Sequence, residues 1–331
     1  MGGHAEQYDS GTFESPAKYK KVFHSIINRL SNPLLSASLF RLYIYMLRLL
    51  LATTLFISSS SADHHLRAGL DPKSVEIKKN DELCVPDYER GKFMSQYYED
   101  TIVYQHFYSD PPQCGGTVIE MGGFDGMTYS NSWFFQYGLQ WRTLLVEAYP
   151  ENYKKMVKNR PDAINLQGAM CKGGGTVKFQ TSNNGAAGGV AQDMSGKHKE
   201  RWTDASSGVV EVQCMLLSDV LRDFYMTHVD LLFLDVEGGE LTVLQTIAWQ
   251  KIRIDIIVVE KDPQSKEKNE AIHKFLKALG YIRPLSMLDH CMKKQVGRVP
   301  MCMPSEIFVL KDFWDKRGKR DAAAAAAKRV K

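Results

Sequence analysis

The residues best suited to chemistry are glycines and carboxylates that follow apolar, strand-like runs. In Val118–Gly126 (VIEMGGFDG), Glu120 lies within the apolar run, and Gly122 and Gly126 lie in the turn after it. Glycine lets the backbone approach a bound ligand closely, and ligands of open α/β sheets sit at the carboxyl ends of the strands. This segment therefore predicts a binding turn for a nucleotide-like ligand.

The spacing within this turn indicates which ligand it takes. A dinucleotide-binding turn reads G-x-G-x-x-G. A match that begins at Gly122 fails, because Phe124 and Met127 stand where the later glycines belong. Glu120 beside the turn would repel a pyrophosphate but attract a sulfonium ligand with a free amino group. The turn thus favours S-adenosyl-L-methionine over NAD.

A second carboxylate, Glu147, lies near the end of the next apolar run, Arg142–Ala148 (RTLLVEA). An acid at the end of the second strand can accept hydrogen bonds from both hydroxyls of a ribose. The ordinary alternative is a strand-end acid that faces water. The glycine turn upstream favours the ribose role, so we predict that Glu147 binds the cofactor.

A third group of acids follows the run Val229–Val236 (VDLLFLDV), where Asp235, Glu237 and Glu240 are interrupted by two glycines. Asp235 and Glu237 would point the same way if the strand continued. Like charges so close raise a pKa unless a cation intervenes. Glu240 suits a helix N-terminus. We predict that Asp235 and Glu237 are catalytic and that Asp235 also binds the cofactor.

The blocks VIEMGGFDGMTYSN, LLVEAYPENY and DLLFLDVEGGELTVL, with a trailing IIVVEKD, resemble the FkbM family of S-adenosylmethionine-dependent methyltransferases. The resemblance covers roughly residues 100–310. It implies a class I methyltransferase fold, which is Rossmann-like and doubly wound, with a mostly parallel seven-stranded sheet and a final antiparallel strand. Members typically methylate hydroxyl oxygens, including those of sugars and natural products. The family also includes proteins regarded as membrane-trafficking factors.

The resemblance assigns roles to individual residues. Three of them would line the methionine part of the cofactor: Glu120, Gly122 and Gly126. Glu147 would bind the ribose, and Asn131 matches the Ser-Asn pair at the start of the family's first helix. Asp235 and Glu237 would face the cofactor and the acceptor from the fourth strand.

Methylation of a hydroxyl also needs a base within hydrogen-bond reach of the acceptor. The candidates are Glu237, Asp235 and His198, the last within residues 181–207, which are rich in Gly, Ser and Asn and predict a long loop. A solvated loop histidine is the ordinary alternative for His198. Asp235 and Glu237 are also hard oxygen ligands for a cation. Nothing else completes a site, so no metal is predicted.

Alternating strand and helix patterns must position these residues. The apolar runs are Thr117–Met121, Arg142–Ala148, Asn165–Met170, Val209–Met215, Val229–Val236 and Arg253–Glu260. Several are continuous, as in strands buried on both faces of a parallel sheet. Lys266–Leu279 predicts an amphipathic helix ended by Gly280, and short strands are expected at Tyr281–Arg283 and Glu306–Leu310. The pattern predicts a doubly wound α/β domain.

The chain divides into five predicted parts: a polar tail at 1–33, a hydrophobic helix at 34–57, a linker or stalk at 58–92, the methyltransferase domain at 93–313, and a basic, Ala-rich tail at 314–331. The net charge is +4, and basic residues are concentrated in the last part. The rest is near neutral and predicts no nucleic-acid surface. The expected partner is a hydroxyl-bearing glycan or small molecule.

Residues 34–57 (LLSASLFRLYIYMLRLLLATTLFI) match a membrane-spanning helix in length, although Arg41 and Arg48 are costly inside a bilayer. A signal-anchor helix is favoured, while a cleaved signal peptide and an amphipathic helix lying on a membrane or on the protein stay open. More basic residues precede the segment than follow it. The positive-inside bias then predicts a cytosolic N-terminus and a luminal catalytic domain in the endoplasmic reticulum or Golgi.

The sequence contains six cysteines: Cys84, Cys114, Cys171, Cys214, Cys291 and Cys302. Six cysteines allow 15 pairings, of which the local pair Cys291–Cys302 is the first choice, and free buried thiols are the alternative. Two functions remain open at this stage. The first is a membrane-anchored O-methyltransferase, and the second is a non-catalytic member that serves as a binding or trafficking module. The intact acids at 120, 147 and 235 favour the enzyme.

Overall fold

The computed structural model describes residues 84–262, 265–284 and 304–317, all of which belong to one compact unit. The predicted N-terminal tail, the hydrophobic segment 34–57 and most of the predicted linker lie outside the described residues. Within the described part of the chain, every helix is too short or too polar to cross a bilayer. The prediction for 34–57 therefore stays a prediction.

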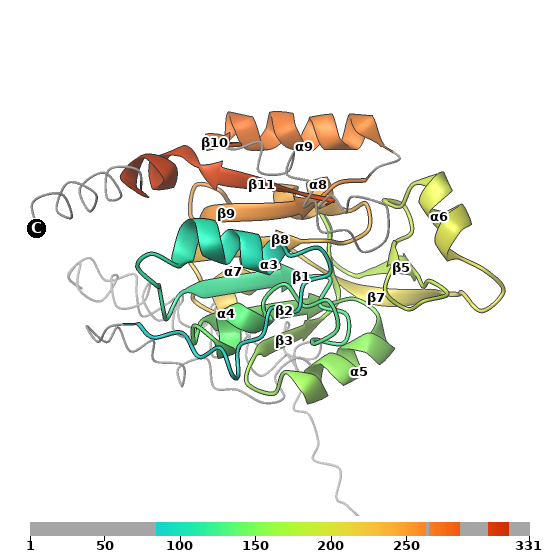
Figure 1. Ribbon diagram of the computed structural model, residues 1–331. Helices are drawn as coiled ribbons and strands as arrows, with labels where there is room; N and C mark the ends of the chain where they lie inside the picture. The colour runs from blue at the N-terminus through green and yellow to red at the C-terminus, as the bar shows by residue number, and fades with distance from the viewer. Residues whose placement is uncertain (1–83, 263–264, 285–303, 318–331) are drawn as a thin grey trace, which may run out of the picture. The chain divides into compact units, whose positions relative to one another are not determined.

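A seven-stranded sheet forms the centre of the unit (Figure 1). Its strands, in spatial order, are β10 (Tyr281–Ile282), β11 (Ser305–Leu310), β9 (Arg253–Glu260), β8 (His228–Leu234), β1 (Thr117–Met121), β2 (Arg142–Glu147) and β3 (Ile164–Gln167). Only β11 runs antiparallel to its neighbours, and the other pairs are parallel. The predicted mostly parallel sheet with a final antiparallel strand is confirmed.

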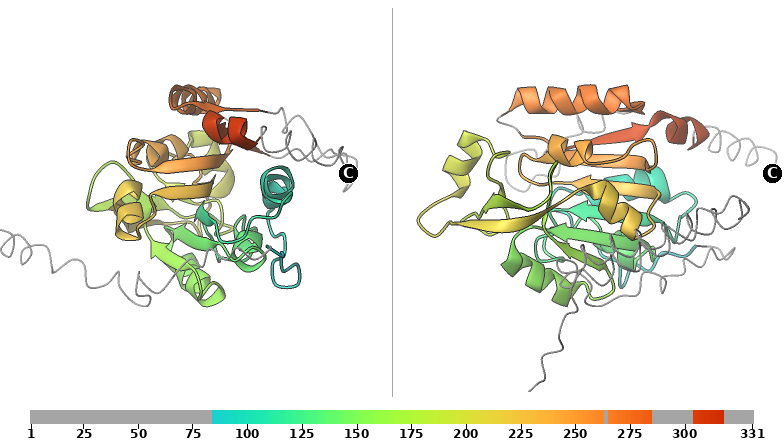
Figure 2. Two further views of the ribbon diagram at one scale, coloured as in Figure 1. Left: turned by 90° about the vertical axis from the view of Figure 1, so that its left-hand side faces the viewer. Right: turned by 180° about the vertical axis from the view of Figure 1, so that it is seen from behind.

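Helices cover both faces of this sheet (Figures 1 and 2). One face carries α7 (Leu217–Asp223), α8 (Glu240–Gln245) and α9 (Lys266–Ala278), whose apolar side chains share a core with the sheet. The other carries α3 (Glu99–Val103), a π-helical turn η1 (Tyr104–Tyr108), α4 (Trp133–Tyr137) and α5 (Pro150–Asn159). Because the central strands are buried on both faces, their sequences are continuously apolar instead of alternating.

A second, four-stranded sheet lies beside the first, at the right in Figure 1. It contains β4 (Ala169–Met170), β7 (Val209–Met215), β5 (Thr176–Gln180) and β6 (Gly189–Val190), and α6 (Gly196–Trp202) follows β6. The prediction of a long loop over 181–207 is therefore wrong in part. The elements there are short, and α6 buries none of its residues, so it leaves no hydrophobic pattern in the sequence.

The predicted run Asn165–Met170 is two strands instead of one. Gly168, with φ of +148°, separates β3 from β4 and turns the chain from the main sheet into the second sheet. A side chain at this position would also collide with the Gln213 carbonyl oxygen, which lies 2.8 Å from the place of a Cβ atom. A glycine at this branch point thus lets one continuous apolar run serve two sheets.

Two disulfides lie within the described residues. Cys84–Cys114 ties the first described residue to the loop before β1, and Cys171–Cys214 crosses the second sheet. Cys291 and Cys302, the pair favoured from sequence, lie outside the described residues. Asp87 donates its backbone N–H to the Gly138 carbonyl at 2.9 Å, so the packed chain begins at least as early as Cys84.

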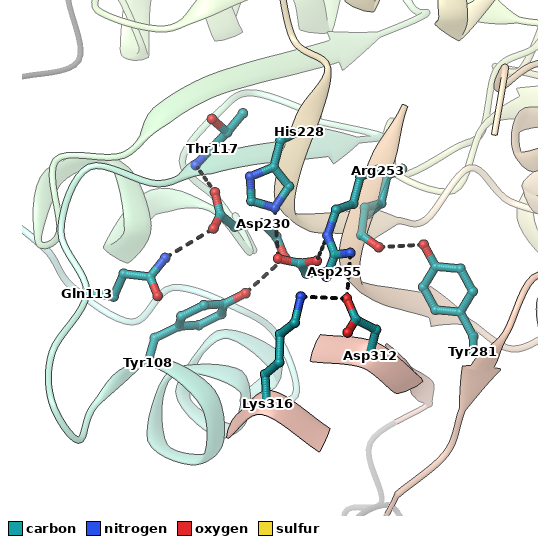
Figure 3. Close-up of polar contacts among 11 residues, drawn as sticks. Tyr108, Gln113, Thr117, His228, Asp230, Arg253, Asp255, Tyr281, Asp312 and Lys316 are labelled. Atoms are coloured by element: carbon teal, nitrogen blue, oxygen red, sulfur yellow. Dashed lines mark hydrogen bonds and ion pairs between the residues drawn. The ribbon is translucent and has the colours of Figure 1, made fainter. Parts of the chain in front are cut away.

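A polar cluster closes the amino-terminal ends of β8 and β9 (Figure 3). The Asp230 carboxylate accepts hydrogen bonds from the Thr117 backbone N–H at 2.8 Å and the Gln113 side chain at 3.1 Å, and Tyr108 donates its hydroxyl to the Asp230 carbonyl at 2.9 Å. These contacts join η1 and β1 to β8. Asp230, which opens the acid-rich block of the sequence, therefore has a structural role at the end of the sheet opposite Asp235.

His228 belongs to the same cluster. Its Nε2 lies 2.8 Å from the Asp255 carboxylate, which also accepts from Arg253 at 2.7 Å. Arg253 continues to Asp312 at 2.9 Å, and Lys316 lies 2.9 Å from the same oxygen. The hydrogen bond to Asp255 raises the pKa of His228 above its ordinary value of 6.5. Half of the His228 side chain is exposed, so solvent screens this effect.

Replacement of His228 by Gln tests this pair through its pH dependence. Because the folded-state pKa is raised, the protonated histidine stabilises the fold fully below about pH 6.5, and this contribution disappears as pH rises through the raised value. We expect urea unfolding to show a larger wild-type advantage over His228→Gln at about pH 5.5 than at about pH 8.5. An equal difference at both pH values would contradict this role.

Candidate functional site

A pocket with an empty volume of about 700 Å³ lies at the carboxyl ends of β1, β2 and β8. We call it the larger pocket. Its wall combines the turn after β1, the ends of β2 and β8, and the second sheet. Among the residues on this wall are Gly122, Phe124, Glu147, Ala148, Asn152, Gly168, Met170, Phe179, Val190, Asp193, Asp235 and Glu237. Its place at the carboxyl ends of parallel strands is typical of a small-molecule site.

Gly122 allows the three strands to meet at this pocket. Its φ is +85°, and a Cβ atom there would lie 1.9 Å from the Asp235 carbonyl oxygen. Its N–H donates to the Val146 carbonyl at 3.0 Å, and Asp235 donates its N–H to Met121 at 3.2 Å. A larger residue would push the β1 turn away from β8, which explains the glycine at the first position of the turn.

Glu147 presents a buried carboxylate at the end of β2. One oxygen accepts from the Phe124 N–H at 2.8 Å and the other from the Tyr149 N–H at 2.7 Å. Each oxygen keeps a second lone pair that can accept a hydroxyl hydrogen. Burial raises the pKa of Glu147 to about 7. A pair of oxygens held in this way suits the two neighbouring hydroxyls of a ribose.

The second sheet supplies an apolar wall beside Glu147. Met170, Phe179 and Val190 are buried and line the larger pocket, together with Phe124 from the β1 turn. A flat aromatic base would gain from burial against these side chains. The pocket therefore offers an apolar side for a base next to a paired acceptor for a ribose.

Three carboxylates meet at the edge of the larger pocket: Asp235 and Glu237 line it, and Glu260, the last residue of β9, lies beside them. Their nearest oxygen atoms all lie within 4.8 Å of one another. Burial raises the pKa of Asp235, and a hydrogen bond from Glu260 opposes the rise. Burial followed by the charge of Asp235 raises the pKa of Glu237 to about 9, and the same causes raise that of Glu260. The cluster thus holds fewer negative charges than carboxyl groups at neutral pH.

Hard oxygen atoms at this spacing are also the atoms that a divalent cation would use. Asp235, Glu237 and Glu260 are therefore the residues of this cluster that could hold a metal. A second group, His228 with Asp230 and Asp255, has similar spacing, but its carboxylates already accept protein hydrogen bonds. The sequence prediction of no metal remains a prediction.

The strand does not continue through Asp235 and Glu237, so the condition under which they would point the same way is not met. β8 ends at Leu234, and Glu237 has a left-handed backbone with φ of 57°. Both residues nevertheless line the larger pocket, because the chain turns around it. Glu240 is the first residue of α8 and accepts the Gly238 N–H at 2.9 Å, so it lies at the helix N-terminus considered for it.

His198 reaches the edge of this cluster from α6. Its Nε2 lies 3.0 Å from the Ala187 carbonyl oxygen and 3.5 Å from a carboxylate oxygen of Glu237. Its side chain is mostly buried, so it is not the solvated loop residue that was the ordinary alternative. His198 contacts Glu237, which lines the larger pocket, but His198 does not line the pocket itself.

Glu120 is placed behind the binding turn. It is buried, and its carboxylate accepts from the hydroxyls of Ser130 at 2.9 Å and Ser132 at 2.6 Å and from the Asn131 N–H at 2.7 Å. It lines neither of the two pockets described in this section. Glu120 therefore holds the loop that follows the turn, which differs from the predicted position against the methionine part of the cofactor.

Arg160, at the end of α5, completes this support. Its guanidinium is fully buried and donates to Ser130 at 2.9 Å, to Ser132 at 3.0 Å and to the Gly126 carbonyl at 2.8 Å. Its positive charge opposes the rise in the pKa of Glu120 that burial causes. Gly126 thus also belongs to the back of the turn, where a Cβ atom would meet the Arg160 side chain at 2.8 Å.

A second, smaller pocket of about 390 Å³ opens on the other side of Asp235. Asp235 lines both pockets, whereas Glu260 and Asn131 line only the smaller one. The Asn131 Oδ1 atom is buried and has no hydrogen-bond partner. The structure therefore gathers Gly122, Glu147 and Glu237 at the larger pocket and puts Asn131 at the smaller one.

Several residues at the two pockets were not singled out from sequence. Glu260 ends an apolar run in the same way as Asp235, so its position could have marked it. Asn152 donates to the Gly185 carbonyl at 2.7 Å and also lowers the pKa of Glu147. Asp193 lies in the segment predicted as a loop, and only the fold brings it to the pocket.

The strand order and the paired pockets define a class I methyltransferase domain. Residues 115–283, half of the chain, match the methyltransferase FkbM domain, and the protein belongs to this family of S-adenosylmethionine-dependent methyltransferases. The resemblance inferred from the three sequence blocks is thereby confirmed. The comparison with curated proteins found no match.

Three of the solved structures with a similar arrangement are described as methyltransferases. A precorrin-6y C5,15-methyltransferase from Geobacter metallireducens GS-15 has 12% identity and a TM-score of 0.33, over 66% of this chain and 90% of that one. A SAM-dependent methyltransferase from Aquifex aeolicus has 11% identity and a TM-score of 0.31, over 73% and 100%. An O-methyltransferase from Bacillus cereus, solved with SAH, has 13% identity and a TM-score of 0.30, over 55% and 68%.

The residues of the larger pocket fit S-adenosylmethionine. Gly122 leaves room for close approach at the turn, Glu147 offers two acceptor oxygens for the ribose, and Phe179 contributes to an apolar wall for the base. Asp235 and Glu237 provide negative charge where a sulfonium would lie beyond the ribose.

Replacement of Arg160 by Met tests the support behind the turn. Removal of the guanidinium leaves the buried Glu120 carboxylate without its cation, so we expect the free energy of unfolding to fall by about 3–5 kcal/mol in urea titrations. Adding Glu120→Gln should recover part of the loss, because the uncompensated charge is then removed. Arg222→Met, on an exposed arginine of α7, serves as the control and should change stability little. A loss no greater than that of the control would contradict the assigned role.

Proposed function

We propose that this protein is an S-adenosylmethionine-dependent O-methyltransferase that acts on a hydroxyl group of a sugar, glycan or small metabolite. The observation that carries the proposal is the position of Asp235 on the walls of both pockets. A carboxylate between two ligand sites can face a methyl donor on one side and an acceptor on the other. Holding the two reactants against each other in this way supplies much of the rate of group transfer.

When bound, S-adenosylmethionine supplies an electrophilic methyl group, which passes to the acceptor oxygen and leaves S-adenosylhomocysteine. The residues of the chain hold the reactants and take the proton. Glu147 fixes the ribose, and Asp235, with Glu237 beside it, accepts the proton of the attacking hydroxyl. A pKa raised by burial makes the ionised carboxylate a stronger base, which suits this step.

His198 supports the same step from outside the pocket. Its Nε2 lies 3.5 Å from Glu237, and its charge opposes the rise in the pKa of Asp235 that burial causes. The alternative of a non-catalytic binding or trafficking module has no observation of its own in its favour, since the carboxylates and the glycine turn needed for catalysis are all assembled.

We further propose a luminal location in the endoplasmic reticulum or Golgi, with 34–57 as the membrane anchor. The disulfides Cys84–Cys114 and Cys171–Cys214 support an oxidising compartment, because such bonds are rare in the cytosol. Protease protection of a C-terminal tag in microsomes tests this orientation. A tag that is digested without detergent would contradict it.

Replacement of Glu147 by Gln tests cofactor binding. The amide would turn an NH₂ group toward one of the two backbone N–H donors and would lose the charge that strengthens the ribose hydrogen bonds. We expect calorimetry with the full-length protein to show binding of S-adenosylmethionine weakened by about ten- to a hundredfold. Glu151→Gln, on the exposed face of α5, is the matched control and should bind as the wild type does. Absence of any heat with the wild type would overturn the proposed function.

Replacement of Asp235 by Asn tests catalysis. Methyl-labelled donor is incubated with secretory or cell-wall extracts, and the labelled product identifies the acceptor and the methylated atom. With that acceptor, we expect Asp235→Asn to lower kcat about a hundred- to ten-thousandfold, as for loss of a general base. Transfer to nitrogen or carbon instead of oxygen, or an unchanged kcat in the variant, would contradict the assignment.

A further inference from the structure

One side of the larger pocket is formed by residues 181–188, which join β5 to β6 in the second sheet and which we call the β5–β6 loop. Gly185, Ala186 and Gly188 of this loop line the pocket. A Cβ atom on Gly185 would lie 3.8 Å from the ring of Phe124, which belongs to the turn after β1. The β5–β6 loop therefore meets the binding turn, and the pocket is closed on this side only while the loop stays there.

Local hydrogen bonds fix the shape of the β5–β6 loop. The Asn184 Oδ1 accepts the backbone N–H groups of Ala186 at 3.0 Å and Ala187 at 3.1 Å. The Ser182 hydroxyl lies 2.9 Å from the same oxygen. These contacts hold the loop together, but its position relative to the main sheet depends on residues outside it.

Asn152 attaches this loop to the layer that packs on the main sheet. It lies in α5, and its Nδ2 donates to the Gly185 carbonyl at 2.7 Å. His198 also holds the loop, with its Nε2 3.0 Å from the Ala187 carbonyl oxygen. However, α6 follows β6 directly and would move together with the loop. An opening of the pocket on this side must therefore break the hydrogen bond from Asn152.

The Asn152 side chain also acts on Glu147, the residue expected to bind the ribose. Both side chains are buried, and both line the larger pocket. Burial raises the pKa of Glu147 to about 7, and hydrogen bonds from the Tyr149 and Phe124 backbones and from the Asn152 side chain oppose the rise. An amide carries two hydrogens. One side chain therefore serves the ribose carboxylate and the loop at the same time.

The charges around Glu147 leave its ionisation to burial and to neutral donors. The larger pocket is lined by three further carboxyl groups, namely Asp193, Asp235 and Glu237. These carboxyl groups are not among the main influences on the pKa of Glu147. On α5, Glu151 pairs with Lys154 at 2.7 Å on the exposed face. In the turn after β1, the Asp125 carboxylate accepts the Thr128 hydroxyl at 2.7 Å. Loss of one neutral donor should thus be visible in the titration of Glu147.

We propose that Asn152 is a positioning residue that couples recognition of the ribose to retention of the β5–β6 loop over the cofactor. This inference rests on the proposed function and adds to it how the methyl donor and its product are kept in the pocket. A ribose on Glu147 holds the carboxylate in its ionised form. The carboxylate in turn keeps the Asn152 amide in the position from which it donates to Gly185. The loop then opens less often while the cofactor is bound.

Asn152→Leu and Asn152→Asp test this coupling in the full-length protein. Calorimetry follows S-adenosylhomocysteine between about pH 6 and pH 9. Ribose hydroxyls donate best to an ionised carboxylate, so the wild-type affinity should rise with pH through the pKa of Glu147 and then level off. Both variants lose the amide donor, so the midpoint of this rise should move upward by about one pH unit. With Glu147→Gln already present, the Asn152 variants should cause no such shift.

The loop supplies a second readout. We expect S-adenosylhomocysteine to slow hydrogen exchange of residues 182–188 in the wild type but not in Asn152→Leu, and to leave that variant about tenfold faster. Asn269→Leu is the matched control, because Asn269 also donates its amide to a backbone carbonyl, that of Asp262 at 2.8 Å. Neither residue lines the larger pocket, so the midpoint, the release rate and the exchange should stay as in the wild type.

The outcomes separate this inference from the function on which it rests. Binding that is weaker at every pH with an unmoved midpoint would assign Asn152 a structural role only and would overturn the coupling, as would unchanged exchange of the loop. Asn152→Asp keeps the size of the side chain and decides the question if Asn152→Leu does not fold. If S-adenosylhomocysteine does not bind the wild type, the proposed function fails first and this inference falls with it.

Discussion

The close approach of the β1 turn to the end of β8 is the constraint on which the site depends. A Cβ atom on Gly122 would lie 1.9 Å from the Asp235 carbonyl oxygen, so only glycine permits this contact. The contact makes the ends of neighbouring parallel strands into one wall and leaves Asp235 between two pockets. The buried pair of Glu120 and Arg160 fixes the far side of the same turn. The position of the β1 turn at the pocket is therefore fixed by the residues that pack behind it.

The acids that follow the strands fall into two groups with different electrostatic surroundings. Glu120 is buried beside a guanidinium, whose positive charge offsets part of the cost of burial. Asp235, Glu237 and Glu260 are partly buried beside one another, and desolvation raises the pKa of all three. A fold gains nothing from such a cluster by itself, because repulsion and desolvation both destabilise it. A cationic methyl donor in the larger pocket would offset this repulsion, so the cluster is best explained by a positively charged ligand.

The sequence allowed a prediction of the main sheet because its strands are buried on both faces and read as continuous apolar runs. Glu147, Asp235 and Glu237 could be placed at the pocket because acids at strand ends gather at one edge of a parallel sheet. The sequence could not place Glu120, since a carboxylate within a strand is equally compatible with a ligand or with a buried arginine far along the chain. The run Val209–Met215 was predicted and forms β7, but β5 and β6 escaped prediction because they are short or alternate weakly. Tyr97 and Glu99 reach the site only through long-range contacts.

The position of the cofactor can be seen in a crystal structure of the full-length protein with S-adenosylhomocysteine. We expect the adenosine in the larger pocket, with both ribose hydroxyls on Glu147, the sulfur atom turned toward Asp235, and an open path from that sulfur to the smaller pocket. A ligand bound elsewhere, or a sulfur atom walled off from Asp235 by protein side chains, would contradict this expectation.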